Sequence, residues 1–247
     1  MKWWLRFSII SRIICVTIWD AFKLQFKLLG KKSAAVRRTI SNAEVNRWGN
    51  DILKIFKVDL QLKKPDNFNF IPEKSYVLMS NHASHMDIPI LFATFAGEKI
   101  GMLAKKELFK IPFLGMGMRL GGCVAIDRED PRQAVLDLRE AERMMLEEGI
   151  RLWVSPEGTR SLDGNLGRFK KGGFRIALAT HATIVPISIV GAHELLPAKT
   201  LDFHPGTTIK VLVGEPIDTA NCKTEDLEKL MAVVHERIAA GLTELRG

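Results

Sequence analysis

Seven short strand candidates, most of them apolar runs, alternate with longer segments of helical periodicity, and this alternation constrains the fold more than any other feature of the chain. They lie at residues 59–62, 76–79, 100–104, 123–126, 150–154, 184–189 and 209–213. Helices are predicted at 90–95, 106–120 with a break at Pro112, 131–148, 174–180 and 224–245. Short strands that alternate with helices pair into parallel or mixed sheets. The chain is therefore predicted to be an α/β protein with a mixed, largely parallel sheet flanked by helices.

One domain accounts for most of the sequence. The chain has 247 residues, of which 47% are apolar, and this is enough to bury a substantial core. It contains no internal repeat and no low-complexity linker. We expect an α/β domain over residues 58–247, preceded by an amphipathic helical segment over residues 1–57.

The first thirty-odd residues are predicted to form a helix that anchors the chain to a membrane. At 100° per residue, its charged side chains fall within an arc of about 120°; they are Lys2, Arg6, Arg12, Asp20, Lys23, Lys27 and Lys31. The other side is mostly apolar and carries Trp3, Trp4, Phe7, Ile10, Ile14, Ile18, Phe22, Phe26 and Leu28. A spanning helix needs about twenty consecutive apolar residues, and charges interrupt this one. We expect one interfacial helix or a bent pair; a core helix and a single spanning helix are the alternatives.

The charge balance indicates an anionic partner. The chain carries 36 basic and 28 acidic residues, which gives a formal net charge of +8. The basic residues near the amino terminus accompany aromatic ones on an amphipathic segment, and the sequence has one tyrosine and no nucleic-acid-binding motif. We therefore expect the partner to be a bilayer with anionic lipid, and not nucleic acid.

The first polar segment whose residue types suit catalysis is Asn81-His-Ala-Ser-His-Met-Asp87. A neutral imidazole can take a proton from a hydroxyl near pH 7, and a carboxylate on its other nitrogen fixes the tautomer. Residues five apart share neither a helix face nor a strand face, so His82 and Asp87 meet only if the chain turns between them. A preceding strand and a helix that begins near Ser84 provide this turn, since Ser84-x-x-Asp87 resembles a capping box.

The same segment has two alternative interpretations. His82 can be an ordinary loop histidine and Asp87 a helix cap. Alternatively, His82, His85 and Asp87 can be ligands of a metal ion. Against a metal site, the segment lacks the His-Glu-x-x-His pattern, and no fourth ligand follows nearby.

The second polar segment, Ser155-Pro-Glu-Gly-Thr-Arg-Ser161, follows the run at 150–154. Gly158 permits a tight backbone path near a ligand, and the planar guanidinium of Arg160 suits a phosphate monoester. Further on, Arg168-Phe-Lys-Lys-Gly-Gly173 places cations and glycines before a predicted helix, where an anion site is plausible. For Lys170 and Lys171 themselves, we favour an ordinary basic surface turn.

Two more cations follow predicted strands. Lys105 comes after the run at 100–104, and Arg128 comes after the run at 123–126. Ligands of open α/β sheets bind beyond the carboxyl ends of the strands, so we expect these cations to converge with Arg160 and His82. Alternatively, Arg128 forms a structural ion pair with Asp127.

Four segments in this order resemble the sequence blocks of the glycerolipid acyltransferase family, and specifically those of lysophosphatidic acid acyltransferases. His82-x-x-x-x-Asp87 resembles the first block, Gly122-Cys-Val-Ala-Ile-Asp-Arg128 the second, Pro156-Glu-Gly-Thr-Arg-Ser161 the third, and Ile184-Val-Pro-Ile187 the fourth. Ser155 departs from the aromatic residue usual at its position, and Ala125 is small for the second block. Both departures concern pocket shape and acyl-chain selectivity.

The resemblance implies an acyltransferase domain over residues 58–247 that moves a fatty acyl group from a thioester to lysophosphatidic acid, giving phosphatidic acid for phospholipid biosynthesis. The co-substrate is acyl carrier protein or coenzyme A loaded with the acyl group, and no cofactor or metal is expected. The sequence has no Gly-x-Ser-x-Gly motif, and Cys15, Cys123 and Cys222 lack a catalytic context, so we expect direct attack without an acyl-enzyme. The expected location is the cytoplasmic face of the inner membrane, as a peripheral or monotopic protein.

The resemblance also implies roles for individual residues. His82 would be the general base and Asp87 would orient it, while Arg128 and Arg160 would bind phosphate. Glu157 would organise the acceptor site together with Gly158 and Thr159 in the same block. Pro186 would shape the apolar wall for the acyl group. Lys105 as a further phosphate ligand rests mainly on its position after a strand.

Other functions remain open at the level of sequence. The acceptor can be glycerol-3-phosphate or another lysophospholipid. The chain can also be a non-catalytic peripheral membrane-binding protein, or a metal-dependent hydrolase. Finally, the apolar segment at residues 108–118 either lines an acyl channel, dips toward the bilayer, or belongs to the ordinary core.

Overall fold

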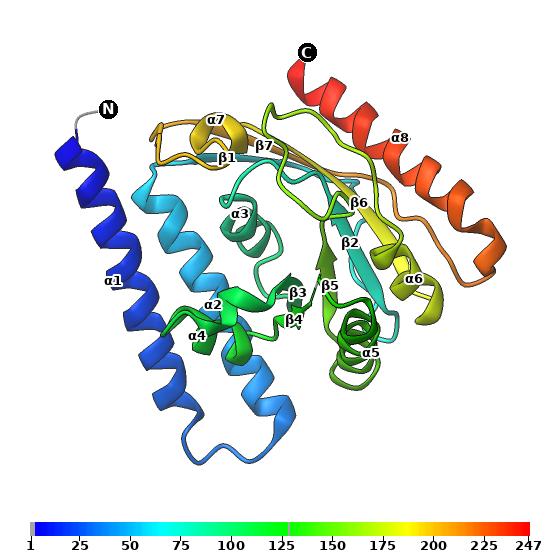
Figure 1. Ribbon diagram of the computed structural model, residues 1–247, viewed down its shortest axis with the longest axis horizontal. Helices are drawn as coiled ribbons and strands as arrows, with labels where there is room; N and C mark the ends of the chain where they lie inside the picture. Colours follow the sequence, from blue (N-terminus) through cyan, green and yellow to red (C-terminus); the bar gives the residue numbers. More distant parts are fainter. Residues whose placement is uncertain (1–2, 128) are drawn as a thin grey trace. The chain divides into compact units, whose positions relative to one another are not determined.

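The computed structural model describes residues 3–127 and 129–247 and shows an α/β protein with a mixed, mostly parallel sheet flanked by helices. The chain divides into two compact units, coloured along the sequence in Figure 1. The first unit comprises residues 56–88 and 153–247, and the second comprises the described residues of 2–55 and 89–152. Arg128 lies outside the described residues.

The first unit contains a sheet in the order β1-β7-β6-β2. Its strands are β1 (Asp59–Lys63), β2 (Tyr76–Ser80), β6 (Thr183–Val190) and β7 (Thr208–Val213). β1 is parallel to β7 and β2 is parallel to β6, whereas β6 and β7 are antiparallel. Both β2 and β6 are buried along almost their whole length, which explains why they appear in the sequence as continuous apolar runs.

Helices cover this sheet and close its core. They are α6 (Gly172–Ala179), the short α7 (Ala192–Leu195), the 3₁₀ turn η2 (Thr224–Asp226) and α8 (Leu227–Arg246). α8 lies along β6 and β7 (Figure 1), and the hydroxyl of Ser188 on β6 donates a hydrogen bond to the Ile238 carbonyl of α8. Gly241 is required at this contact, because a Cβ there would lie 2.3 Å from Ser188 Oγ.

The second unit contains a short parallel strand pair and most of the remaining helices. Its elements are α1 (Trp3–Leu28), α2 (Ala34–Ile55), β3 (Ile100–Lys105), η1 (Lys106–Lys110), α4 (Leu114–Leu120), β4 (Val124–Ile126) and α5 (Pro131–Glu148). α3 (Asp87–Thr94) and β5 (Arg151–Val154) cross the boundary between the units. α5 begins where the Asp130 carboxylate accepts the N–H groups of Arg132 and Gln133, and it ends at Gly149, whose φ is +67°.

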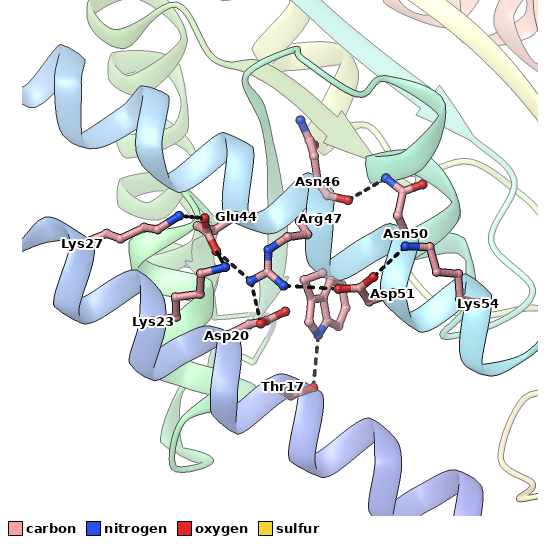
Figure 2. A network of polar contacts seen from close by, with 11 residues as sticks. Thr17, Asp20, Lys23, Lys27, Glu44, Asn46, Arg47, Asn50, Asp51 and Lys54 are labelled. Carbon is pink, nitrogen blue, oxygen red and sulfur yellow. Dashed lines mark hydrogen bonds and ion pairs between the residues drawn. The ribbon is translucent and has the colours of Figure 1, made fainter.

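A network of charged side chains joins α1 to α2 (Figure 2). The guanidinium of Arg47 on α2 lies 2.6 Å from Asp20 on α1 and 2.7 Å from Glu44 on its own helix. Lys23 and Lys27 on α1 also pair with Glu44. Asp20, Lys23 and Lys27 belong to the charged arc predicted for the first helix. These three arc residues therefore contact α2, and the opposite, apolar side of α1 is left exposed.

Candidate active site

The connection between β2 and α3 is held in place by Asn81. Its side-chain amide donates to the carbonyl of Ile189 and accepts from the N–H of Ile189, both at 2.9 Å. These two bonds continue the pairing of β2 with β6 for one residue beyond the end of β2. They fix the point from which His82 leaves the sheet.

Asp87 closes the turn onto His82. Its Oδ2 accepts the backbone N–H groups of Ala83 and Ser84 at 2.9 and 3.0 Å, and lies 2.7 Å from His82 Nδ1. Asp87 is fully buried, and these backbone donors provide partners that a buried carboxylate cannot obtain from water. The structure confirms the predicted contact between His82 and Asp87.

The helix start differs slightly from the predicted capping box. Asp87 accepts the Ser84 N–H, as the motif requires, but the Ser84 hydroxyl accepts from the N–H of Met86 at 3.1 Å and donates to Leu196. α3 begins at Asp87 itself, between the turn predicted near Ser84 and the helix predicted from residue 90. Asp87 is therefore both a cap of the turn and the partner of His82.

His82 is positioned by its neighbours on every side but one. Its ring meets that of Trp153 edge-on, with centroids 5.7 Å apart, and Trp153 is itself fixed by a hydrogen bond to Ser80. The His82 side chain is 17% exposed. In the tautomer whose Nδ1 donates to Asp87, Nε2 presents its lone pair. Within the described chain, Nε2 makes no hydrogen bond.

Glu157 ties the second polar segment to the first. Its Oε1 accepts the His82 N–H at 2.8 Å, and its Oε2 accepts the Gly167 N–H at 2.9 Å. Burial raises the pKa of Glu157 even though these two donors favour its charged form. The Ser161 N–H in turn donates to the His82 carbonyl at 2.7 Å. Residues 157–161 therefore run beside His82.

Glycines allow the close approaches in this region. Gly158 has φ = +69°, a conformation that other residues adopt at a cost, and its N–H closes the turn onto the Ser155 carbonyl at 3.1 Å. A Cβ on Gly167 would lie 2.9 Å from Glu157 Oε2, so a side chain there would disturb the bond that Glu157 accepts.

Arg160 follows this turn and is partly buried, and its positive charge interacts electrostatically with His85. Desolvation by neighbouring atoms and the positive charge of Arg160 lower the pKa of His85 to about 4, so this imidazole is neutral at pH 7. Among the described residues, no carboxylate lies within ion-pair distance of Arg160. The structure thus brings together His82, Asp87, Glu157 and the turn of Gly158, Thr159 and Arg160.

The other predicted site residues lie elsewhere in the chain. Lys105 ends β3 in the second unit, and its ammonium is 3.6 Å from Glu107. Asp127 pairs with Lys106, and Arg128 is outside the described residues. Pro186 is buried inside β6, in register with Met79 of β2. The proposed substrate contacts of Lys105, Arg128 and Pro186 stay predictions.

Sequence reasoning missed Asn81, Trp153 and Gly167 as supports of the site. Asn81 bonds the backbone of Ile189, 108 residues away, and the Gly167 N–H bonds the Glu157 carboxylate, 10 residues away. No local pattern shows either contact. Trp153 sits in an apolar run and looked like ordinary core. In the part of the chain that the structure describes, no three His, Cys, Asp or Glu side chains are grouped so that they could hold a metal ion.

Comparison with known proteins places this geometry among acyltransferases. Residues 60–190 match the family described as Acyltransferase. The chain is 36% identical over 141 residues to the chloroplastic 1-acyl-sn-glycerol-3-phosphate acyltransferase LPAT1 of Arabidopsis thaliana, covering 57% of this chain and 39% of that protein. It is 30% identical over 198 residues to the human 1-acyl-sn-glycerol-3-phosphate acyltransferase beta, covering 80% of this chain and 70% of that protein.

A solved structure is similar over nearly the whole chain. The crystal structure of the 1-acyl-sn-glycerophosphate (LPA) acyltransferase PlsC from Thermotoga maritima has a TM-score of 0.84 and 27% sequence identity, and the match covers 98% of this chain and 95% of that one. By contrast, the matched part is 39% of the Arabidopsis protein and 51% of a chloroplastic relative from Brassica napus, so the chain spans about half the length of these two curated relatives.

Proposed function

We propose that this chain, which belongs to the acyltransferase family, transfers a fatty acyl group from a thioester to the free hydroxyl of lysophosphatidic acid and so produces phosphatidic acid. The observation that carries the proposal is the 2.7 Å contact between His82 Nδ1 and the buried Asp87 carboxylate. Beside it lies a turn that leads to Arg160, which forms no ion pair with a described residue. The names of the relatives, which are 1-acyl-sn-glycerol-3-phosphate acyltransferases, support the same acceptor.

The proposed reaction begins at His82 Nε2, which removes the proton from the acceptor hydroxyl as its oxygen attacks the thioester carbonyl. The tetrahedral intermediate then collapses with cleavage of the C–S bond, and the imidazolium returns the proton to the leaving thiolate. Asp87 holds the ring in the required tautomer and stabilises the imidazolium. General-base catalysis of this kind contributes roughly 10²–10⁴-fold in rate. The reaction needs no metal or resident cofactor, because the thioester is already activated.

Arg160 is the proposed ligand of the acceptor phosphate. Its guanidinium presents paired donors that match phosphate oxygens. Glu157 organises the acceptor site indirectly, since it joins the backbone of His82 to that of Gly167 and so fixes the turn of Gly158 and Thr159. Arg128 and Lys105 are proposed as further phosphate ligands, and Pro186 as part of the acyl wall, on the basis of the family resemblance and strand position.

We further propose that residues 1–57 bind the surface of an anionic bilayer, at the cytoplasmic face of the inner membrane. α1 exposes a large apolar face that includes Trp3, Trp4, Phe7, Ile14, Trp19, Phe22, Phe26 and, just beyond its end, Leu29. Exposed aromatic side chains of this density are typical of interfacial helices. None of the described helices combines the length and the low charge that a membrane crossing requires.

The segment at residues 108–118 supports this surface. It contains the end of η1 and most of α4. α4 contacts α1, and the rings of Phe22 and Phe113 lie 5.2 Å apart. Phe113 has φ = +62°, an unusual conformation for a bulky residue. We propose that this segment extends the apolar face of α1 toward the acyl chain.

Vesicle binding tests the membrane part of the proposal. Replacing Phe7 and Phe26 by serine should reduce partitioning to anionic vesicles by about tenfold or more, because each exposed ring contributes on the order of 1 kcal/mol or more when it enters the interface. Leu162 and Leu201 are similarly exposed outside α1, and replacing both of them by serine gives the matched control variant. Equal partitioning of both double variants would argue against an α1 interface.

Product analysis tests the reaction. The enzyme should be offered lysophosphatidic acid, glycerol-3-phosphate and lysophosphatidylcholine together, once with acyl carrier protein and once with coenzyme A as the thioester carrier. Mass spectrometry should find phosphatidic acid as the main product with at least one carrier. A main product formed from glycerol-3-phosphate or from another lysophospholipid would identify that compound as the acceptor instead. No acylated product at all would overturn the proposal.

A further inference from the structure

We propose that Lys170 joins Arg160 in a two-cation site for a phosphate monoester at the turn that follows β5. This inference rests on the acyl transfer proposed above and adds a substrate-binding residue to it. The sequence predicted Lys170 and Lys171 together as an ordinary basic surface turn. The structure separates the two lysines.

Lys170 is held against the Gly158 turn by backbone and side chain. Its N–H donates to the Pro156 carbonyl at 2.7 Å, which sets residue 170 beside the residues that precede Glu157. Its side chain then passes over Gly158: a Cβ added to this glycine would lie 2.9 Å from Lys170 Cδ and 3.1 Å from Nζ. The ammonium group therefore lies against the backbone that leads directly into Arg160.

Lys171 points to a different partner. Its Nζ lies 2.6 Å from Glu228 Oε1 at the start of α8, and the charge of Arg168 also acts on Glu228. These two cations share one carboxylate. Lys170, in contrast, forms no ion pair with any described residue, and the same holds for Arg160.

The carboxylate of Glu157 does not neutralise this pair. Both oxygens of Glu157 accept backbone N–H groups, from His82 and from Gly167, and the side chain is buried. Two uncompensated cations therefore flank one tight turn. A phosphate monoester carries a charge close to −2 at pH 7, and an arginine fork together with a lysine point charge matches it in charge and in donor geometry.

A phosphate monoester occurs on both proposed substrates: the head group of lysophosphatidic acid carries one, and coenzyme A carries one on its ribose. Initial-rate kinetics of Lys170→Gln and Lys171→Gln distinguish them. Loss of a charge-assisted bond should raise one KM by about tenfold or more in Lys170→Gln, while Lys171→Gln stays within about twofold of the parent. A raised acceptor KM assigns the phosphate to the lysolipid, and a raised coenzyme A KM assigns it to the donor. Two unchanged KM values in Lys170→Gln would overturn the site.

Chemical labelling tests the site without relying on turnover. The intact protein is treated with an acetylating reagent in the presence of glycerol-3-phosphate, of inorganic phosphate or of glycerol, and peptides are analysed by mass spectrometry. Both phosphates should protect Lys170 by about threefold or more relative to glycerol, with Lys171 as the internal reference. Protection that persists although no acylated lysolipid forms would retain the phosphate site and reject only the reaction. Equal labelling of both lysines under all three conditions would reject the site.

Discussion

The turn after β2 and the contact between α1 and α2 both bury carboxylates, and they compensate the negative charge in different ways. At the turn after β2, Asp87 and Glu157 accept backbone N–H groups, and Asp87 adds the imidazole of His82. Between α1 and α2, Asp20 and Glu44 are compensated by the cations of Lys23, Lys27 and Arg47 (Figure 2).

The difference has a functional consequence. Between the helices, every cation of the network already has a carboxylate partner, so the network holds the helices together. Although burial opposes it, hydrogen bonds from Lys27 and Arg47 keep the pKa of Glu44 below its usual value. At the turn, N–H dipoles hold the carboxylates and leave Arg160 and Lys170 uncompensated. At the turn, Asp87 and Glu157 are thus held without ion pairs to described cations, which leaves Arg160 and Lys170 available for the proposed phosphate.

The largest effect should come from His82→Asn. This change removes the proposed base but keeps a side chain of polar character at a partly exposed position, so folding should be nearly unaffected. We expect kcat/KM for acyl transfer to fall by roughly 10²–10⁴-fold, equivalent to about 3–5 kcal/mol of transition-state stabilisation. Steady-state kinetics, with circular dichroism as the folding control, provide the check. Retention of parent activity in a folded variant would remove His82 from the mechanism.

Arg47→Met tests the network between α1 and α2, and it should lower the free energy of unfolding instead of the rate of acyl transfer. It leaves Asp20 and Glu44 buried with fewer partners, and since Arg47 is about a third exposed we expect a loss of about 2–3 kcal/mol in the free energy of unfolding. Urea unfolding measures this loss. Lys54→Met is the control, because the exposed Lys54–Asp51 pair should contribute less than about 1 kcal/mol. Similar losses of unfolding free energy in both variants would mean that the network stabilises the protein no more than the exposed Lys54–Asp51 pair does.

Thr17→Val probes a neutral contact of the same helix pair. The Trp48 indole donates to the Thr17 hydroxyl at 3.1 Å, and a valine of similar shape cannot accept this bond (Figure 2). The free energy of unfolding should fall by about 1 kcal/mol, which is less than for Arg47→Met. Urea unfolding of the two variants and their combination ranks the contacts. A larger loss for Thr17→Val than for Arg47→Met would reverse our ranking of charged over neutral contacts.

The smallest effect should come from His85, which contributes to the pH dependence of stability. The pKa of His85 is lowered to about 4 in the folded protein, against 6.5 ordinarily, by desolvation, by Arg160 and by His82, and Asp87 opposes this. The unfolded chain therefore binds the extra proton first, and His85 lowers stability as pH falls from about 6.5 toward 4. His85→Gln should reduce this loss by less than about 1 kcal/mol, because water screens the partly exposed ring. Urea midpoints at pH 7 and pH 5 show whether parent and variant differ.

Much of the fold could be predicted from hydrophobic patterning. All the predicted strand runs became strands within about one residue at either end, and α5 occupies its predicted range of 131–148. The break predicted at Pro112 separates η1 from α4. The four-residue α7 was not predicted, because a single turn leaves no periodicity to detect. Of the two forms expected for the start of the chain, one helix or a bent pair, the structure has one helix, α1, and α2 follows it within residues 1–57. The membrane role of this segment stays a proposal.

The site was predictable only where its contacts are local or stereotyped. The His82–Asp87 contact followed from chemistry and spacing, whereas Glu157 acts through Gly167 and the backbone of His82, which spacing does not show. Lys170 and Lys171 are adjacent in sequence and differ only in which partner each meets in three dimensions. In the same way, Glu44 and Arg47 lie on a helix with a weak apolar pattern, so their contacts with α1 could not be foreseen.

The central claim is that His82 and Asp87 act as one unit, and a double-mutant cycle measures this directly. Initial rates are compared for the parent, His82→Asn, Asp87→Asn and the double variant, all confirmed as folded. If Asp87 acts through His82, the double variant should lose no more activity than His82→Asn alone. Losses that multiply, so that the double variant falls by the product of the two single losses, would show that the two side chains act independently.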